Sequence, residues 1–246
     1  MLDFITHLLD VNTTFFTVLD YPMSYLEFFG TIFNLLCVWL VARNNIWNWP
    51  IGIVGVVLFG VLFYQIQLYS DLFEQFYYLI TGFYGWWAWW YYRQDKKQAK
   101  EKVLKISHNS QIHNLIYLGI IIISTFALTA FVSNIHIIFP NIFPVAASYP
   151  FLDAFTTVLS FVATILMIYK KIECWYLWIF VDIIGVWLYF AKGVVFISLL
   201  YFIFLILASK GLYNWLKIYD KDNKKTDNRT GNRKILPATS RTQILD

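Results

Sequence analysis

Seven long apolar segments constrain this chain more than any other feature of its sequence. They lie near 24–42, 50–68, 71–91, 115–137, 152–170, 175–192 and 194–216. An α-helix rises about 1.5 Å per residue, so about 20 apolar residues cross the roughly 30 Å hydrocarbon core of a bilayer. Each segment has about that length. The sequence therefore predicts an all-α integral membrane protein with seven transmembrane helices.

The composition agrees with a membrane location. Apolar residues make up 59% of the chain and charged residues 14%, whereas soluble domains average roughly 25% charged residues. A soluble protein of this size would leave roughly 30% of its chain surface in water, too much for so apolar a sequence. The formal charge of +4 is small, and the basic residues form no continuous face. Nucleic-acid binding is therefore excluded as a function class.

The basic residues predict how the chain is oriented, because cytoplasmic loops are enriched in Lys and Arg. Alternate connections hold Arg43, six basic residues within 93–105, the pair Lys170 and Lys171, and the basic tail after 217. The opposite connections, near 69, 138–151 and 193, hold almost no basic residue except Lys192. We therefore expect a multi-pass membrane protein with the N-terminus outside and the C-terminus in the cytoplasm.

An internal repeat emerges when the chain is shifted by 126 residues, the separation of Trp49 from Trp175. The same shift places Gly85 on Gly211 and Trp89 on Trp215. The first and fifth apolar segments then correspond, and helices four crossings apart point the same way through a bilayer. The pattern predicts a 3+1+3 arrangement with parallel repeats. Internal repeats of this kind are typical of transporters that bind solute at the repeat interface.

This organisation divides the chain into six parts. They are an N-terminal lead over 1–20, a first three-helix repeat over 21–92, a cytoplasmic loop over 93–114, a linker helix over 115–137, a second three-helix repeat over 138–217, and a disordered cytoplasmic tail over 218–246. The lead is acidic and too short for a confident span, so an interfacial or disordered segment is expected there. It also lacks the basic start of a signal peptide.

Asp182 is the most informative polar residue, because a carboxylate at mid-membrane depth costs several kcal/mol unless it is paired or meets water. Trp175 and Trp178 precede it by seven and four residues, which places all three on one helix face. Two indoles and a carboxylate can bind an aromatic, positively charged solute. The alternatives are an interhelical hydrogen bond for Asp182 and an interfacial aromatic belt for the tryptophans. Asn34 and Gln75 are further cavity candidates, whereas Glu74 could simply extend to water.

Motifs of catalytic chemistry are absent from the sequence. It contains no P-loop, H-E-x-x-H, C-x-x-C or G-x-S-x-G motif. Cys37 and Cys174 lie in or beside apolar segments, as helix-packing residues do. We expect a non-enzyme without a metal or cofactor. An ion channel remains an alternative, although it leaves the aromatic face of the sixth helix without a clear role.

Several segments resemble the bacterial PnuC family of nicotinamide riboside transporters. They are NIWNWP at 45–50, LFGVLFYQIQLY at 58–69, YGWWAW at 84–89, WYLW at 175–178 followed by Val181-Asp182, LYFAKG at 188–193 and LLY at 199–201. The resemblance extends over nearly all of 24–216. It implies a SWEET-like fold, a homotrimer, and uptake of nicotinamide riboside by facilitated diffusion, without ATP or a coupling ion. Phosphorylation inside the cell would then retain the nucleoside.

The resemblance also implies site residues. The tryptophan pair of the sixth helix, Trp175 and Trp178, lines the substrate site in the family, and Asp182 matches a position where relatives carry Asp or Asn. Asn48 and Tyr201 lie in the matching motifs and complete the predicted site. Relatives in this family are associated with thiamine or riboflavin, so a related vitamin is the alternative substrate.

Overall fold

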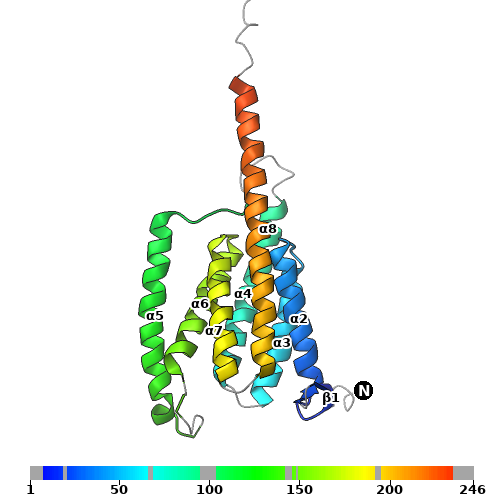
Figure 1. Ribbon diagram of the computed structural model, residues 1–246, viewed down its shortest axis with the longest axis vertical. Helices are drawn as coiled ribbons and strands as arrows, with labels where there is room; N and C mark the ends of the chain where they lie inside the picture. The colour runs from blue at the N-terminus through cyan, green and yellow to red at the C-terminus, as the bar shows by residue number, and fades with distance from the viewer. Residues whose placement is uncertain are drawn as a thin grey trace, which may run out of the picture.

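The computed structural model describes residues 8–18, 21–65, 69–94, 104–141, 146–147, 149–191 and 195–234. This part of the chain forms seven helices and one two-stranded antiparallel sheet (Figure 1). The elements are β1 (Thr14–Val18), β2 (Tyr21–Ser24), α2 (Tyr25–Ala42), α3 (Asn48–Gln65), α4 (Tyr69–Gln94), α5 (Gln111–Ile138), α6 (Pro150–Ile168), α7 (Glu173–Ala191) and α8 (Val195–Lys234). Each predicted apolar segment corresponds to one helix, so the all-helical fold class is confirmed.

Six of these helices are long and apolar enough to cross a membrane, by length and composition: α2, α3, α5, α6, α7 and the Ile197–Lys224 part of α8. The seventh, α4, has 26 residues, which is also ample length for a span. Its many Trp and Tyr residues lower its hydropathy, since aromatic residues with polar atoms score poorly on such scales. It packs against α3 and α6 and lies within the bundle in Figure 1.

The helices form two consecutive sets of three, separated by α5. Within the first set α2 packs on α3 and α3 on α4; within the second α6 packs on α7 and α7 on α8. The sets meet through α2 with α8 and through α4 with α6, so the first helix of each set contacts the last helix of the other. The linker helix α5 packs on α6 at the edge of the bundle (Figure 1).

The turn between the first two helices of each set has the same backbone conformation. Asn44 and Lys170, which are 126 residues apart, both have φ of 53°. The Asn44 N–H donates to the carbonyl of Val41 at 2.8 Å, and the Lys170 N–H donates to that of Met167 at 3.0 Å. A left-handed residue closing a helix in this way is a common C-terminal signal. Neither residue is glycine, so the tertiary structure sets both turns.

The aligned tryptophans and glycines make matching contacts in the two sets. A Cβ atom built on Gly85 would lie 2.3 Å from Trp49 Cη2, and one built on Gly211 would lie 2.4 Å from Trp175 Cη2. Only glycine leaves room for an indole at that distance, and small residues let membrane helices approach closely. The third helix of each set therefore packs tightly on the second.

A second tryptophan in each set joins the two halves. The Trp89 indole N–H donates to the Ile168 carbonyl at 3.0 Å, and the Trp215 indole N–H donates to the Val41 carbonyl at 3.0 Å. Each bond runs from the last helix of one set to the end of the first helix of the other. The two halves are thus tied by reciprocal hydrogen bonds that satisfy buried indoles.

The described part of the N-terminal lead is an ordered hairpin rather than a disordered segment. Ser24 and Glu27 form a capping box that begins α2. The Tyr21 hydroxyl donates to Glu27 Oε1 at 2.5 Å, and burial together with this bond raises the pKa of Tyr21 to about 12. The Gln65 side chain at the end of α3 accepts from Val11 N and donates to the Leu9 carbonyl. The hairpin is therefore fastened to the adjoining ends of α2 and α3.

The polar tail also differs from its prediction. Helix α8 continues to Lys234 and extends beyond the rest of the bundle in Figure 1, so disorder from 218 onward was wrong for 218–234. Residues with good helix propensity, including four lysines between 217 and 225, follow the last apolar turn without a break. Residues 235–246 lie outside the described part, as do 95–103 of the predicted loop.

Candidate functional site

A polar group at the contact of α4 with α6 forms one wall of the candidate site. The Thr157 hydroxyl donates to Glu74 Oε1 at 2.5 Å. One turn further, the Tyr77 hydroxyl donates to the Phe161 carbonyl at 2.8 Å, and the two rings stack with centroids 4.0 Å apart. Polar bonds between membrane helices are favourable because lipid offers no partner. The Glu74 carboxylate therefore points into the protein at the interface between the two halves.

Asp182 and Tyr201 form the opposite wall, on α7 and α8. Asp182 is only 4% exposed. The Tyr201 ring packs over Gly185 and stacks on Tyr189 with centroids 5.2 Å apart. Gly185 lies three residues after Asp182, so Tyr201 packs on α7 within one helical turn of Asp182. The structure thus places two predicted residues, Asp182 and Tyr201, close together at the contact of α7 with α8.

Trp178 lies one helical turn before Asp182 on the same face of α7. Its ring is half-buried and packs at the edge of the core. Its indole nitrogen is buried and has no hydrogen-bond partner within the described part of the chain. The same is true of the indole nitrogens of Trp49 and Trp175, so what distinguishes Trp178 is that its ring is only half-buried and leaves a face for a ligand. Trp178 combines an aromatic face with an available donor.

Trp175 has the surroundings of a packing residue. It is 1% exposed, lies against Gly211, and meets Trp215 edge-on with centroids 5.5 Å apart and an interplanar angle of 87°. Its counterpart Trp49 meets Trp89 at 5.5 Å and 86°. Because the same contact occurs in both halves, Trp175 fixes the α7–α8 packing and positions the segment that carries Trp178.

The three predicted residues of the first half lie in different places. Asn34 donates to the Gly30 carbonyl at 2.9 Å and lies against Gly55, between α2 and α3. Asn48 is 1% exposed and donates to the Asn45 carbonyl at 2.6 Å, so it stabilises the α2–α3 turn. Gln75 lies near Gly60 and faces α3.

Sequence reasoning underestimated two residues of the polar group. Glu74 lies in a helix of the membrane bundle, and the argument from the cost of a buried charge applied to it as much as to Asp182. Its position one turn into α4 favoured an extension to water instead. Thr157 gave no signal, because a lone threonine in an apolar helix usually bonds to its own backbone.

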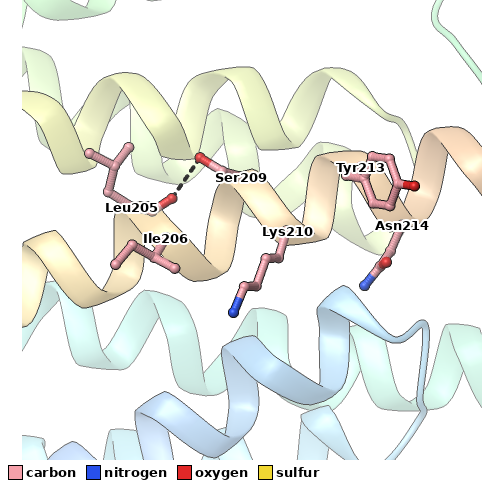
Figure 2. A pocket seen from close by; sticks show the side chains of 6 residues that line it. All are labelled: Leu205, Ile206, Ser209, Lys210, Tyr213 and Asn214. Carbon is pink, nitrogen blue, oxygen red and sulfur yellow. Dashed lines mark hydrogen bonds between the residues drawn. The ribbon is translucent and has the colours of Figure 1, made fainter.

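The surface hollow on α8 is a different feature. It has a volume of about 470 Å³ and is lined by Leu205, Ile206, Ser209, Lys210, Tyr213 and Asn214 (Figure 2). Ser209 donates to the Leu205 carbonyl at 2.8 Å, within the helix. All of the lining residues belong to one helix, whereas a solute site needs walls from several elements. This hollow is therefore not the candidate site.

Metal chemistry finds no support in the described residues. No group of three or more His, Cys, Asp and Glu side chains there lies close enough to hold a metal ion. Within the same part of the chain Cys37 and Cys174 are free thiols. The side chains gathered at the candidate site offer aromatic faces, carboxylates and hydroxyls, which can stack on and hydrogen-bond to a solute.

Comparisons with known proteins agree on one family. The family model described as nicotinamide mononucleotide transporter matches residues 24–217. Nicotinamide riboside transporter PnuC of Escherichia coli K12 is 33% identical over 213 residues, which cover 80% of this chain and 87% of the relative. Riboflavin/roseoflavin transporter RibM of Streptomyces davaonensis is 28% identical and covers 83% and 91%. The crystal structure of the vitamin B3 transporter PnuC superposes with a TM-score of 0.61 at 24% identity and covers 80% and 83%.

Proposed function

This chain belongs to the nicotinamide mononucleotide transporter family, and from this premise we propose that it takes up nicotinamide riboside across the bacterial inner membrane by facilitated diffusion. The family consists of membrane transporters, which agrees with the prediction of a non-enzyme. The substrate follows from curated relatives named as nicotinamide riboside transporters, one of them 33% identical.

Two features of the bundle interior support the proposal: the Glu74 carboxylate bonds to Thr157 where the halves meet, and Asp182 is buried on the face of α7 that also carries Trp178. Nicotinamide riboside has a cationic aromatic ring and a polyhydroxy sugar. The Trp178 face suits the ring, because cation–π contact contributes about 0.5–2 kcal/mol. Asp182 and Glu74 favour its positive charge, and Tyr201 offers a hydroxyl to the ribose. Gln75 and Asn34 contribute from the α3 side, and Trp175 and Asn48 hold the helix starts.

We propose the SWEET-like 3+1+3 arrangement with parallel repeats for the architecture. The matching turns, the matching Trp–Gly contacts and the reciprocal contacts α2–α8 and α4–α6 support it. We also propose a homotrimer, with the N-terminus outside and the C-terminus in the cytoplasm. The orientation follows from the basic residues, and a reporter fused after residue 217 tests it.

A related vitamin is the second candidate substrate. The riboflavin/roseoflavin transporter RibM matches 83% of this chain at 28% identity. Riboflavin carries a larger, uncharged ring system, for which the carboxylates Glu74 and Asp182 would have no cationic partner. The acidic side chains therefore favour the cationic pyridine nucleoside, because a positive charge nearby stabilises the ionised form of a carboxyl group.

An uptake assay on proteoliposomes tests the function. Labelled nicotinamide riboside, riboflavin and thiamine are offered separately, without ATP or an ion gradient. We expect uptake of nicotinamide riboside to equilibrium and a block by excess unlabelled nucleoside. If riboflavin alone were taken up, the second candidate substrate would replace nicotinamide riboside. A requirement for an ion gradient would refute facilitated diffusion.

A further inference from the structure

A second cavity lies at the end of the bundle from which α8 extends. Its volume is about 430 Å³, within the roughly 300–1,000 Å³ of small-molecule pockets. The lining residues come from five places in the chain: Arg43, Asn44, Asn45 and Ile46 of the α2–α3 turn, Trp89 and Tyr92 of α4, Leu104, Lys105 and Ile106 before α5, Lys170 after α6, and Ile218 and Asp222 of α8. None of these lining residues belongs to the candidate site of Glu74, Trp178, Asp182 and Tyr201.

The charges of this cavity favour an anion. The lining holds three cations, Arg43, Lys105 and Lys170, and one carboxylate, Asp222, which leaves two net positive charges. Arg43 lies over the Trp39 ring at 3.9 Å and Lys170 over the Trp89 ring at 4.1 Å, so aromatic faces orient two of the cations. Arg binds phosphate with two parallel hydrogen bonds, and Lys is a common phosphate partner. The Asn44 side-chain oxygen is buried and without a hydrogen-bond partner in the described part, and a side-chain amide can present either its oxygen or its nitrogen.

The two halves treat the same turn differently at this end. In the second half Ser107 pairs with the turn: its N–H donates to the Lys170 carbonyl, and its carbonyl accepts from Ile172 N, both at 3.1 Å. The corresponding residues of the first half, Asn44 and Ile46, line the cavity, and so does Lys170 of the second half. A ligand bound there would contact the turns of both halves at once.

We propose that this cavity binds a phosphate-bearing small molecule of mononucleotide size on the cytoplasmic side, and that the bound ligand slows uptake by holding the two halves together. The positive charge attracts the phosphate, and Tyr92 provides an aromatic wall for a base. A ligand that contacts both halves stabilises one of their arrangements over the other. The effect on uptake rests on the proposed transport function; the binding does not.

Binding is measured on the purified full chain in nanodiscs of uncharged lipid. The probe is nicotinamide mononucleotide, titrated by calorimetry while nicotinamide riboside is held at saturation. We expect the mononucleotide to bind without displacing the nucleoside. Replacing two cations, Arg43→Gln with Lys105→Gln, should weaken it about tenfold or more, as loss of charge-assisted hydrogen bonds does. Lys210→Gln, which removes a basic residue of α8 outside this cavity, should leave binding unchanged.

Two results would overturn the site. Mononucleotide binding that is abolished by saturating nicotinamide riboside would place it in the transport site instead. Binding that is equally strong in the Arg43→Gln/Lys105→Gln variant, with its melting temperature unchanged, would show that the cations do not hold the phosphate.

An experiment with anionic lipid distinguishes a soluble phosphate ligand from a lipid headgroup. Nanodiscs containing phosphatidylglycerol should leave mononucleotide binding intact if the ligand is soluble. Competition by that lipid, sensitive to the same two substitutions, would support the phosphate site with a lipid headgroup as its occupant. Inorganic phosphate should bind more weakly than the mononucleotide, since it lacks the base.

Uptake gives an independent readout. Mononucleotide trapped inside proteoliposomes should slow entry of labelled nicotinamide riboside for the parent, and not for the Arg43→Gln/Lys105→Gln variant. Unchanged uptake despite confirmed binding would refute the proposal that the bound ligand slows uptake by holding the two halves together. A chain that binds the mononucleotide but takes up no nicotinamide riboside would refute the proposed function and leave the binding site standing.

Discussion

The α2–α4 half and the α6–α8 half can be compared position by position at the shift of 126 residues. Trp49 lies against Gly85 as Trp175 lies against Gly211. The Trp–Trp pairs that follow have the same centroid distance of 5.5 Å, with angles of 86° and 87°. These residues serve helix packing, and both halves keep them.

The positions that surround the candidate site differ between the halves. Trp178 of α7 corresponds to Gly52 of α3, Asp182 to Val56, and Tyr201 to Gln75. A bulky indole and a carboxylate thus occur on one side, where the other half has a glycine and an aliphatic residue. What is common to the halves builds the bundle, and what is unique to one half gives the interior its charge and its aromatic face.

The largest effect is expected at the shared glycines. Gly85→Ala and Gly211→Ala each place a Cβ about 2.3–2.4 Å from an indole carbon, and overpacking of this kind costs about 1–3 kcal/mol or more. Both substitutions should lower the melting temperature of the detergent-solubilised protein by a similar amount. Gly119→Ala in α5, where nothing lies within 4 Å of the added atom, is the control and should be neutral. A much larger drop in melting temperature for one substitution than for the other would show that the two Trp–Gly contacts are not equivalent.

The next effect concerns the unique indole. Trp178→Ala should weaken nicotinamide riboside binding by about tenfold or more, because it removes the cation–π contact. Trp178→Phe should be milder, since an aromatic face remains. Trp90→Ala, at a residue 52% exposed on α4, is the control and should leave affinity nearly unchanged in calorimetry. Parent-like binding by Trp178→Ala would move the site toward Asn34 and Gln75.

The unique carboxylate should have a graded effect. Asp182→Asn should reduce affinity by a few fold if hydrogen bonding is its role, and Asp182→Leu by about tenfold. Equal harm from both substitutions would indicate that the charge itself is required. Val56→Ile at the corresponding position of the first half should change affinity little. Measured uptake rates alongside affinity distinguish a binding role from a folding defect.

The smallest effect is expected where only the second half has a covered turn. Glu173 pairs with His108 at 3.0 Å, and the His108 side chain is 40% exposed. Exposed pairs contribute less than about 1 kcal/mol. Converted into a temperature shift, so small a free-energy change predicts that Glu173→Ala lowers the melting temperature by about one or two degrees. Trp47→Ala, at the corresponding exposed position, removes no charged contact. Its effect on the melting temperature should therefore not depend on the salt concentration.

The candidate site was predictable in part. Asp182 and Trp178 were chosen because a carboxylate in an apolar helix is costly and the spacing of four residues fixes a shared face, and their role in binding stays a prediction. The contact of Glu74 with Thr157 was not foreseen, because periodicity assigns a face to one helix and does not say which helix lies opposite. Trp175 was grouped with Trp178 by the same spacing, and only its contact with Gly211 identifies a packing role.

By itself the sequence determined the number and approximate positions of the helices, although not the end of α8, together with the internal repeat and the family. These depend on local quantities, namely the length of apolar segments and the order of Trp and Gly residues at one offset. Only the tertiary structure decided that α2 meets α8 and α4 meets α6, that Glu74 meets Thr157, and that Ser107 pairs with the turn of the second half. The physical reason is that lipid is as apolar as leucine, so apolar helix faces alone specify no partner; close Gly–Trp contacts and a few polar bonds select the arrangement.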